Sequence, residues 1–391
     1  MSALKFLLKN LLKQPRQTKA AQGFTLLELL IALALTFLII TPLMSLVISL
    51  MGNDRQEQAK VTSQQEIQAA LDYIAQDLQQ AIYVYDAQAL SNPTSTDATT
   101  SGIVDQIPPV QQAPGCNDSS TCVPVLAFWK RKYFARTDTI TDPITNANVS
   151  IASLNDSSRD SDRFVYSLVV YYLIKDSNPT WSKVARIGRF EIRDGIINPD
   201  TPPPPNPAPP AVPPAASSGN YLLAPDIGFN RFDLSLSPAS VQQSLNSWIK
   251  SSGAYTQKVE TLVDFIDDTD VQKFRDASLT QFVPPENDGG DVSTICSNNA
   301  TGTDADLNPT SSRVPPDSID QLQIGSFYAC VNPSNTQGQS VVQVFVRGNA
   351  LPRISNDQNT WHSIDTKALS YRPTASVRVA VRGLLSSNQS K

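Results

Sequence analysis

The hydrophobic pattern begins with one long apolar run. Residues 29–51 form a stretch of 23 residues without a charge. As a helix rising about 1.5 Å per residue the run would span roughly 35 Å, which exceeds a hydrocarbon core of about 30 Å. It therefore predicts a transmembrane helix over residues 24–51, in which Pro42 can introduce a kink.

A helical pattern continues beyond the apolar run. Apolar residues at spacings of four, three, four and four form one stripe: Ile67, Leu71, Ile74, Leu78 and Ile82. No proline or glycine interrupts residues 53–85. We therefore predict one helix from about Phe24 to about Tyr85, whose stem half, residues 52–85, packs on a sheet.

Residues 86–391 contain short segments rich in Val, Ile, Phe and Tyr, bounded by turn residues. The predicted strands are 124–131, 163–174, 184–193, 326–331, 341–348 and 376–382. Residues 164–173 are too apolar for an exposed edge strand and are placed centrally, and 241–249 can form a short helix. The prediction is an α+β fold, with the long N-terminal helix packed on an antiparallel β-sheet domain.

Polar and proline-rich insertions interrupt this domain. Residues 198–218 hold ten prolines and predict a solvated, polyproline-type segment. Strand-like sequence on both sides favours a long hairpin excursion, while a linker between two domains is the alternative. Residues 92–101 and 287–312 are also loop-like.

Charge gives the membrane run an orientation. Five cations and no acid precede it: Lys5, Lys9, Lys13, Arg16 and Lys19. The charges that follow nearly cancel, so the positive-inside bias predicts a cytoplasmic N-terminus and a periplasmic bulk. The net charge of −5 gives no electrostatic footprint for nucleic-acid binding.

One acid, Glu28, lies at the start of the apolar run, where an unpaired carboxylate would be costly. The run is too long for the core of a cleaved secretory signal, and a plain anchor does not explain Glu28. The stretch from Gly23 to Glu28 resembles the processing and N-methylation motif of type IV prepilins and of type II secretion pseudopilins. The resemblance implies that a prepilin peptidase removes a cytoplasmic leader, residues 1–23, and that Phe24 is then methylated. It also implies that Glu28 pairs with the Phe24 amine of a neighbouring subunit.

Two further resemblances concern the subtype. Residues 64–81 look like the stem of J-type minor pseudopilins. The turn 347–353, the strand 371–379 and the insertions look like the cyanobacterial pseudopilins linked to hormogonium polysaccharide secretion. The implied role is a filament subunit that supports polysaccharide secretion and gliding, with other pilins or pseudopilins and the inner-membrane assembly platform as partners. The alternative is a pilus-tip binding module, an adhesin that contacts a glycan or a surface.

The four cysteines face the oxidising side in this orientation, which favours disulfides. Pairing Cys116 with Cys122 and Cys296 with Cys330 is the simplest of three possibilities. A zinc site is disfavoured, because the chain has no Cys-x-x-Cys sequence and one histidine.

Catalytic motifs are lacking from the sequence, which predicts that the chain is not an enzyme and needs no cofactor. The single histidine, His362, is expected to be exposed. Asp264, Asp267 and Asp268, with Asp270 beside them, are candidate calcium ligands, but their spacing favours a solvated turn. The basic turn 347–353 is interpreted as structural, with glycan contact as the alternative.

Overall fold

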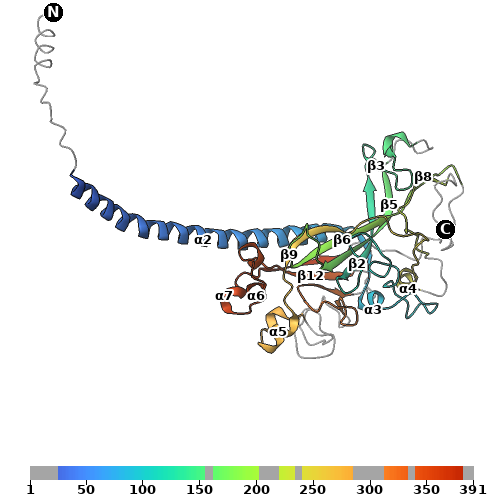
Figure 1. Ribbon diagram of the computed structural model, residues 1–391. Helices are drawn as coiled ribbons and strands as arrows, with labels where there is room; N and C mark the ends of the chain where they lie inside the picture. The colour runs from blue at the N-terminus through green and yellow to red at the C-terminus, as the bar shows by residue number, and fades with distance from the viewer. Residues whose placement is uncertain are drawn as a thin grey trace, which may run out of the picture. The chain divides into compact units, whose positions relative to one another are not determined.

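The computed structural model describes residues 25–154, 162–201, 220–233, 240–284, 312–332 and 340–381. The chain forms two compact units, residues 1–57 and residues 58–391. A 54-residue helix, α2 (Leu26–Gln79), runs through the end of the first unit into the second (Figure 1). The second unit contains antiparallel sheets, so the predicted α+β class is confirmed.

The helix α2 ends at Gln79, earlier than predicted. Residues 81–84 instead form strand β1 (Ala81–Val84), which pairs with strand β2 (Cys122–Phe134). The sequence of β1, Ala-Ile-Tyr-Val, contains β-branched and aromatic residues that pack well on a pleated surface. Sheet pairing therefore overrides the helical spacing that had included Ile82.

The larger sheet has five antiparallel strands in the order β1-β2-β5-β6-β9. Its remaining strands are β5 (Arg163–Ile174), β6 (Ala185–Arg193) and β9 (Glu260–Ile266). The predicted central position of β5 is confirmed, since it pairs with β2 on one side and β6 on the other.

The second sheet has the order β10-β11-β12-β13. Its strands are β10 (Ser312–Val314), β11 (Phe327–Asn332), β12 (Val341–Arg347) and β13 (Thr374–Ala380). An isolated bridge joins Ile266 at the end of β9 to Gly348 after β12 and so links the two sheets.

Short elements fill the connections. The helices are α3 (Ala87–Ser91), α4 (Val241–Asn246), α5 (Val271–Asp276), α6 (Gln358–Trp361) and α7 (Thr366–Leu369), and the 3₁₀ turns are η1 (Ile151–Ser153), η3 (Thr280–Phe282) and η4 (Leu351–Arg353). Two hairpins are formed by β3 (Thr139–Thr141) with β4 (Asn148–Ser150) and by β7 (Ile196–Ile197) with β8 (Tyr221–Leu223). The β7–β8 ladder joins both ends of the proline-rich segment, of which residues 202–218 lie outside the described residues.

The main core lies between the stem half of α2 and the two sheets. Ile67, Leu71, Ile74 and Leu78 are each at most 1% exposed and belong to one buried cluster with residues of both sheets. On the other face of the larger sheet, Trp129 packs edge-on against Phe229, Phe232 and Trp248. The predicted Cys116–Cys122 disulfide is present beside this core.

Candidate assembly site and its attachment to the outer domain

The start of α2 is closed by a reciprocal pair of hydrogen bonds between Thr25 and Glu28. The Thr25 amide donates to Glu28 Oε2 at 3.3 Å, and the Glu28 amide donates to Thr25 Oγ1 at 3.2 Å. This is a capping box, which satisfies two amides that have no partner within the helix. It also holds a carboxylate at the positive end of the helix dipole. The capping role of Thr25 was not expected from the sequence, although Thr-x-x-Glu is a recognisable capping signal.

Gly23 and Phe24 lie outside the described residues, so cleavage and methylation there stay predictions. The described part of the motif shows that the Glu28 carboxylate is turned back toward the N-terminal end of the helix. A carboxylate in that position can accept from its own chain and from a neighbouring chain.

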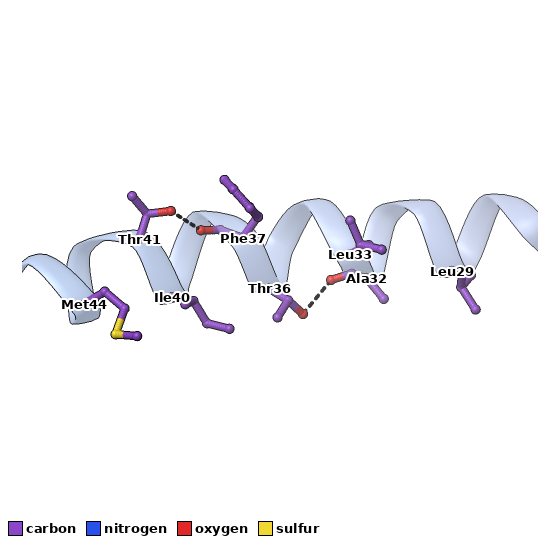
Figure 2. A pocket seen from close by; sticks show the side chains of 8 residues that line it. All are labelled: Leu29, Ala32, Leu33, Thr36, Phe37, Ile40, Thr41 and Met44. Atoms are coloured by element: carbon purple, nitrogen blue, oxygen red, sulfur yellow. Dashed lines mark hydrogen bonds between the residues drawn. The ribbon is translucent and has the colours of Figure 1, made fainter.

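The first half of α2 presents apolar side chains on all sides. One face carries a shallow groove along its length, lined by Leu29, Ala32, Leu33, Thr36, Phe37, Ile40, Thr41 and Met44 (Figure 2). The Thr36 and Thr41 hydroxyls donate to the carbonyls of Ala32 and Phe37 at 2.7 and 2.8 Å. The hydrogen-bonding groups of both threonines are thereby paired within the helix, as a membrane environment requires. By length and composition, α2 is apolar enough to cross a membrane.

The second half of α2 is fastened to the larger sheet through Asp77. Its carboxylate accepts from Lys130 Nζ at 2.7 Å, Arg189 Nε at 2.8 Å and the Tyr171 hydroxyl at 2.7 Å. Glu191 lies beside the same cations, 2.8 Å from Arg189. Burial opposes ionisation of Glu191, but Arg189, Lys132 and Lys130 outweigh it and lower its pKa to about 2.

A second attachment comes from the turn after β12. Arg353 donates to Ser63 Oγ at 3.1 Å and pairs with Glu66, both on α2, while its guanidinium stacks 3.8 Å from the centre of the Phe265 ring. Lys60 lies over the Tyr371 ring at 4.5 Å. The contacts of Arg353 fit the structural interpretation of the turn 347–353, and the alternative of glycan contact stays a prediction.

The prediction of a solvated acidic turn after β9 was wrong. Asp267 is fully buried and accepts from Arg347 Nε at 2.7 Å and Arg372 Nε at 3.2 Å. Asp268 is also buried, 2.9 Å from Lys175 Nζ. A cluster of acidic residues in the sequence is typical of a solvated surface turn. Here cations from distant segments pair with the buried carboxylates and offset the cost of their burial.

The calcium candidates do not converge on a common point. Asp264 accepts from the backbone and the hydroxyl of Ser182, whereas Asp267 and Asp268 face their own cations. Among the described residues no three His, Cys, Asp or Glu side chains are grouped to hold a metal ion.

His362 is also placed differently from the prediction. Its side chain is 26% exposed, and its Nε2 lies 2.8 Å from Asp268 Oδ1. The hydrogen bond to Asp268 raises the pKa of His362 above its ordinary value, against the opposing effect of burial. Burial opposes ionisation of Asp268, yet His362 and Lys175 together lower its pKa.

The cysteine predictions stand in part. The Cys116–Cys122 bridge is confirmed, and Cys330 is disulfide-bonded as well. Cys296 lies outside the described residues, so the Cys296–Cys330 pairing stays a prediction.

Comparison with known proteins identifies the start of the chain. A family model described as the prokaryotic N-terminal methylation motif matches residues 18–44. No curated protein and no solved structure matches the chain. The motif is a type IV pilin-like signal, and with the apolar helix it supports a membrane-anchored, single-pass protein of the pilin or pseudopilin class. It indicates a structural subunit that a prepilin peptidase processes and that assembles with other pilins.

Proposed function

We propose that the chain is a minor pseudopilin, a structural subunit of a type II secretion or type IV pilus-like filament. Its N-terminus would lie in the cytoplasm and its β-sheet domain in the periplasm. One observation carries the proposal: the methylation motif leads directly into a helix that is apolar and uncovered in its first half and built into a folded domain in its second. Membrane storage and filament assembly require this combination.

The physics of Glu28 supports the assembly role. In hydrocarbon an ionised carboxylate requires a partner, and Thr25 is the only neighbour that hydrogen-bonds its carboxylate in the described residues. Cleavage after Gly23 would create the missing cation at Phe24. Because one subunit's amine can meet the Glu28 carboxylate of another, the cost of burying each charge favours assembly.

The attachment of the stem supports a subunit that transmits mechanical force along the filament. Asp77, Glu66 and Ser63 bind side chains that are distant in sequence, so a force on the helix is transmitted to the sheets through ion pairs and a packed core. The role in polysaccharide secretion and gliding rests on the sequence resemblance of the turn 347–353 and the strand 371–379.

The test is processing at Gly23. Wild type should begin at Phe24 with a methylated amine, whereas Gly23→Val should keep the leader, because a branched side chain obstructs the peptidase cleft. Gly52→Val is the matched control, since a Cβ added at Gly52 meets nothing within 4 Å outside its own stretch of helix. It should be processed normally.

Intact mass and N-terminal sequencing of membrane-extracted protein identify the first residue of wild type, Gly23→Val and Gly52→Val. A wild-type chain that still begins at Met1 would overturn the proposal.

A further inference from the structure

The second sheet carries a groove at one end of its outer face. The groove has a volume of about 330 Å³, at the lower end of the range of ligand sites. Its floor comes from the ends of β11, β12 and β13, and one wall comes from η3. It is lined by Gln281, Phe282, Val283, Gly325, Ser326, Tyr328, Phe345, Val346, Arg347, Thr374, Ala375 and Ser376.

Two stacked aromatic rings form the apolar part of the floor. Tyr328 and Phe345 are cross-strand partners, with ring centres 4.7 Å apart and planes at 9°. Ser376 is the next residue across the sheet, opposite Phe345. Both rings are half-buried and line the groove rather than the core. An apolar surface is therefore bordered by hydroxyl groups.

The polar part of the groove contains an unsatisfied group. Ser326 is 1% exposed, and its Oγ has no hydrogen-bond partner within the described part of the chain. A buried hydroxyl without a partner is unfavourable by about 1–3 kcal/mol. Ser326 is among the residues that line the groove, so a ligand hydroxyl that reaches its Oγ would supply the missing hydrogen bond. The exposed residues Thr374 and Ser376 offer two more hydroxyls.

The lining offers little charge to a ligand. Arg347 is its one formally charged residue, and its guanidinium donates to Asp267, to the Phe282 carbonyl and to the Ile324 carbonyl. Burial raises the pKa of Tyr328 to about 12, so its hydroxyl stays neutral at physiological pH. An uncharged ligand with both apolar faces and many hydroxyls fits these properties.

We propose that this groove binds a segment of a neutral polysaccharide. The apolar C–H face of one sugar ring packs against Phe345, whose other face is stacked on Tyr328, and its hydroxyls bond to Ser326, Thr374 and Ser376. The small volume holds one or two rings of a longer chain that continues into solvent. The inference deepens the proposed role in polysaccharide secretion and rests on it, but its test does not depend on leader processing, because the groove lies entirely in the second unit.

Binding is measured by titration calorimetry on the full chain. The protein is kept in a zwitterionic detergent, because the sugar headgroup of a maltoside would compete for the groove. The probes are cellohexaose, laminarihexaose, maltohexaose and chitohexaose, with hexagalacturonate as the acidic comparison. At least one neutral probe should bind saturably and more tightly than the acidic one.

Two variants test the groove. Ser326→Ala should weaken binding roughly three- to tenfold, the contribution of one hydrogen bond, without lowering the midpoint of unfolding. Ser244→Ala is the matched control: Ser244 is 2% exposed in α4, its Oγ is likewise unpartnered, and it is not among the groove residues. Ser376→Trp fills the groove from an exposed position and should abolish binding while the domain stays folded.

Three results would overturn the proposal. One is the absence of saturable binding to every neutral probe by folded wild type. The second is binding that Ser326→Ala and Ser376→Trp leave unchanged. The third is tighter binding of the acidic probe, which would contradict a neutral ligand.

Discussion

The two halves of α2 share one helical backbone and have opposite surroundings. Between Leu26 and Met51 every residue is exposed, whereas Ile67, Leu71, Ile74 and Leu78 are at most 1% exposed. Both halves carry apolar residues, so hydrophobicity alone does not say what covers a helix face. The first half must be covered by lipid or by other subunits, while the second is covered by its own domain.

Asp77 in the second half and Glu28 in the first half also differ in whether the described part of their own chain supplies a charged partner. Asp77 has two cations and a tyrosine hydroxyl from its own chain. Glu28 contacts Thr25, which carries no charge. Loss of Asp77 should therefore damage the fold of the domain, and loss of Glu28 should damage assembly between chains.

The largest effect is expected from Glu28→Leu. The variant removes a costly charge from the apolar helix, so its abundance and leader cleavage should equal those of wild type. Assembly should be lost, because a neighbour's amine would be left unpaired at about 3–5 kcal/mol. Cross-linking to the other filament subunits is the measurement, with Glu57→Leu on the same helix as control.

If Glu28→Leu cross-links and exports as wild type does, Glu28 is not an assembly residue. The first half of α2 would then be a plain anchor, and the contrast between the two acids would disappear.

The converse experiment is Asp77→Leu. It leaves Glu191 as the one carboxylate beside Lys130 and Arg189 in the described residues, so the destabilisation should be smaller than the roughly 3–5 kcal/mol of a fully broken buried pair. Urea unfolding followed by tryptophan fluorescence measures the free energy of unfolding. Asp72→Leu is the control: Asp72 is exposed and accepts from Gln68 one turn away, so its effect should stay within about 0.5 kcal/mol. Equal stability of the two variants would show that Asp77 does not hold the stem.

Features that depend on local sequence could be predicted, and features that depend on contacts between distant segments could not. Local patterns were enough for the membrane run, the buried stripe and the central β5, because each depends on residue types at a regular spacing. The end of α2 was missed because the pairing of β1 with β2 overrides local helical spacing. The burial of Asp267 was missed because Arg347 and Arg372 lie 80 and 105 residues away in sequence. The groove depends on strand register at Tyr328 and Phe345, which composition does not reveal.

The disulfides should affect only the outer domain. By loop entropy, opening the Cys116–Cys122 bridge should cost about 2 kcal/mol, and opening the larger predicted Cys296–Cys330 loop about 4 kcal/mol. Relative to wild type, Cys330→Ala should lower the free energy of unfolding more than Cys116→Ala does. Leader cleavage should be unchanged in both variants. Non-reducing peptide mapping identifies the pairs. Finding Cys330 joined to a cysteine other than Cys296 would contradict the predicted pairing.

The smallest effect on the free energy of unfolding is expected from His362→Gln in the outer domain. This effect should depend on pH. Because Asp268 raises the pKa of His362, protonated His362 stabilises the folded state. This contribution is fully present below the unfolded pKa of about 6.5 and is lost as pH rises through the folded pKa. Its size should be below about 1 kcal/mol, as for a partly exposed ion pair.

Asp194 supplies the background to this measurement, because burial raises its pKa to about 6. The folded state therefore binds the Asp194 proton more tightly than the unfolded state does, so this contribution to stability decreases as pH rises from about 4 to about 6. The same contribution is present in wild type and in the variant. The difference between the two unfolding curves therefore isolates His362, the chain's single histidine. Wild type should exceed His362→Gln in stability at pH 5.5 and should lose that advantage by pH 8.5. A difference that is constant across this range, or that grows with pH, would show that the histidine contributes by packing and not by its charge.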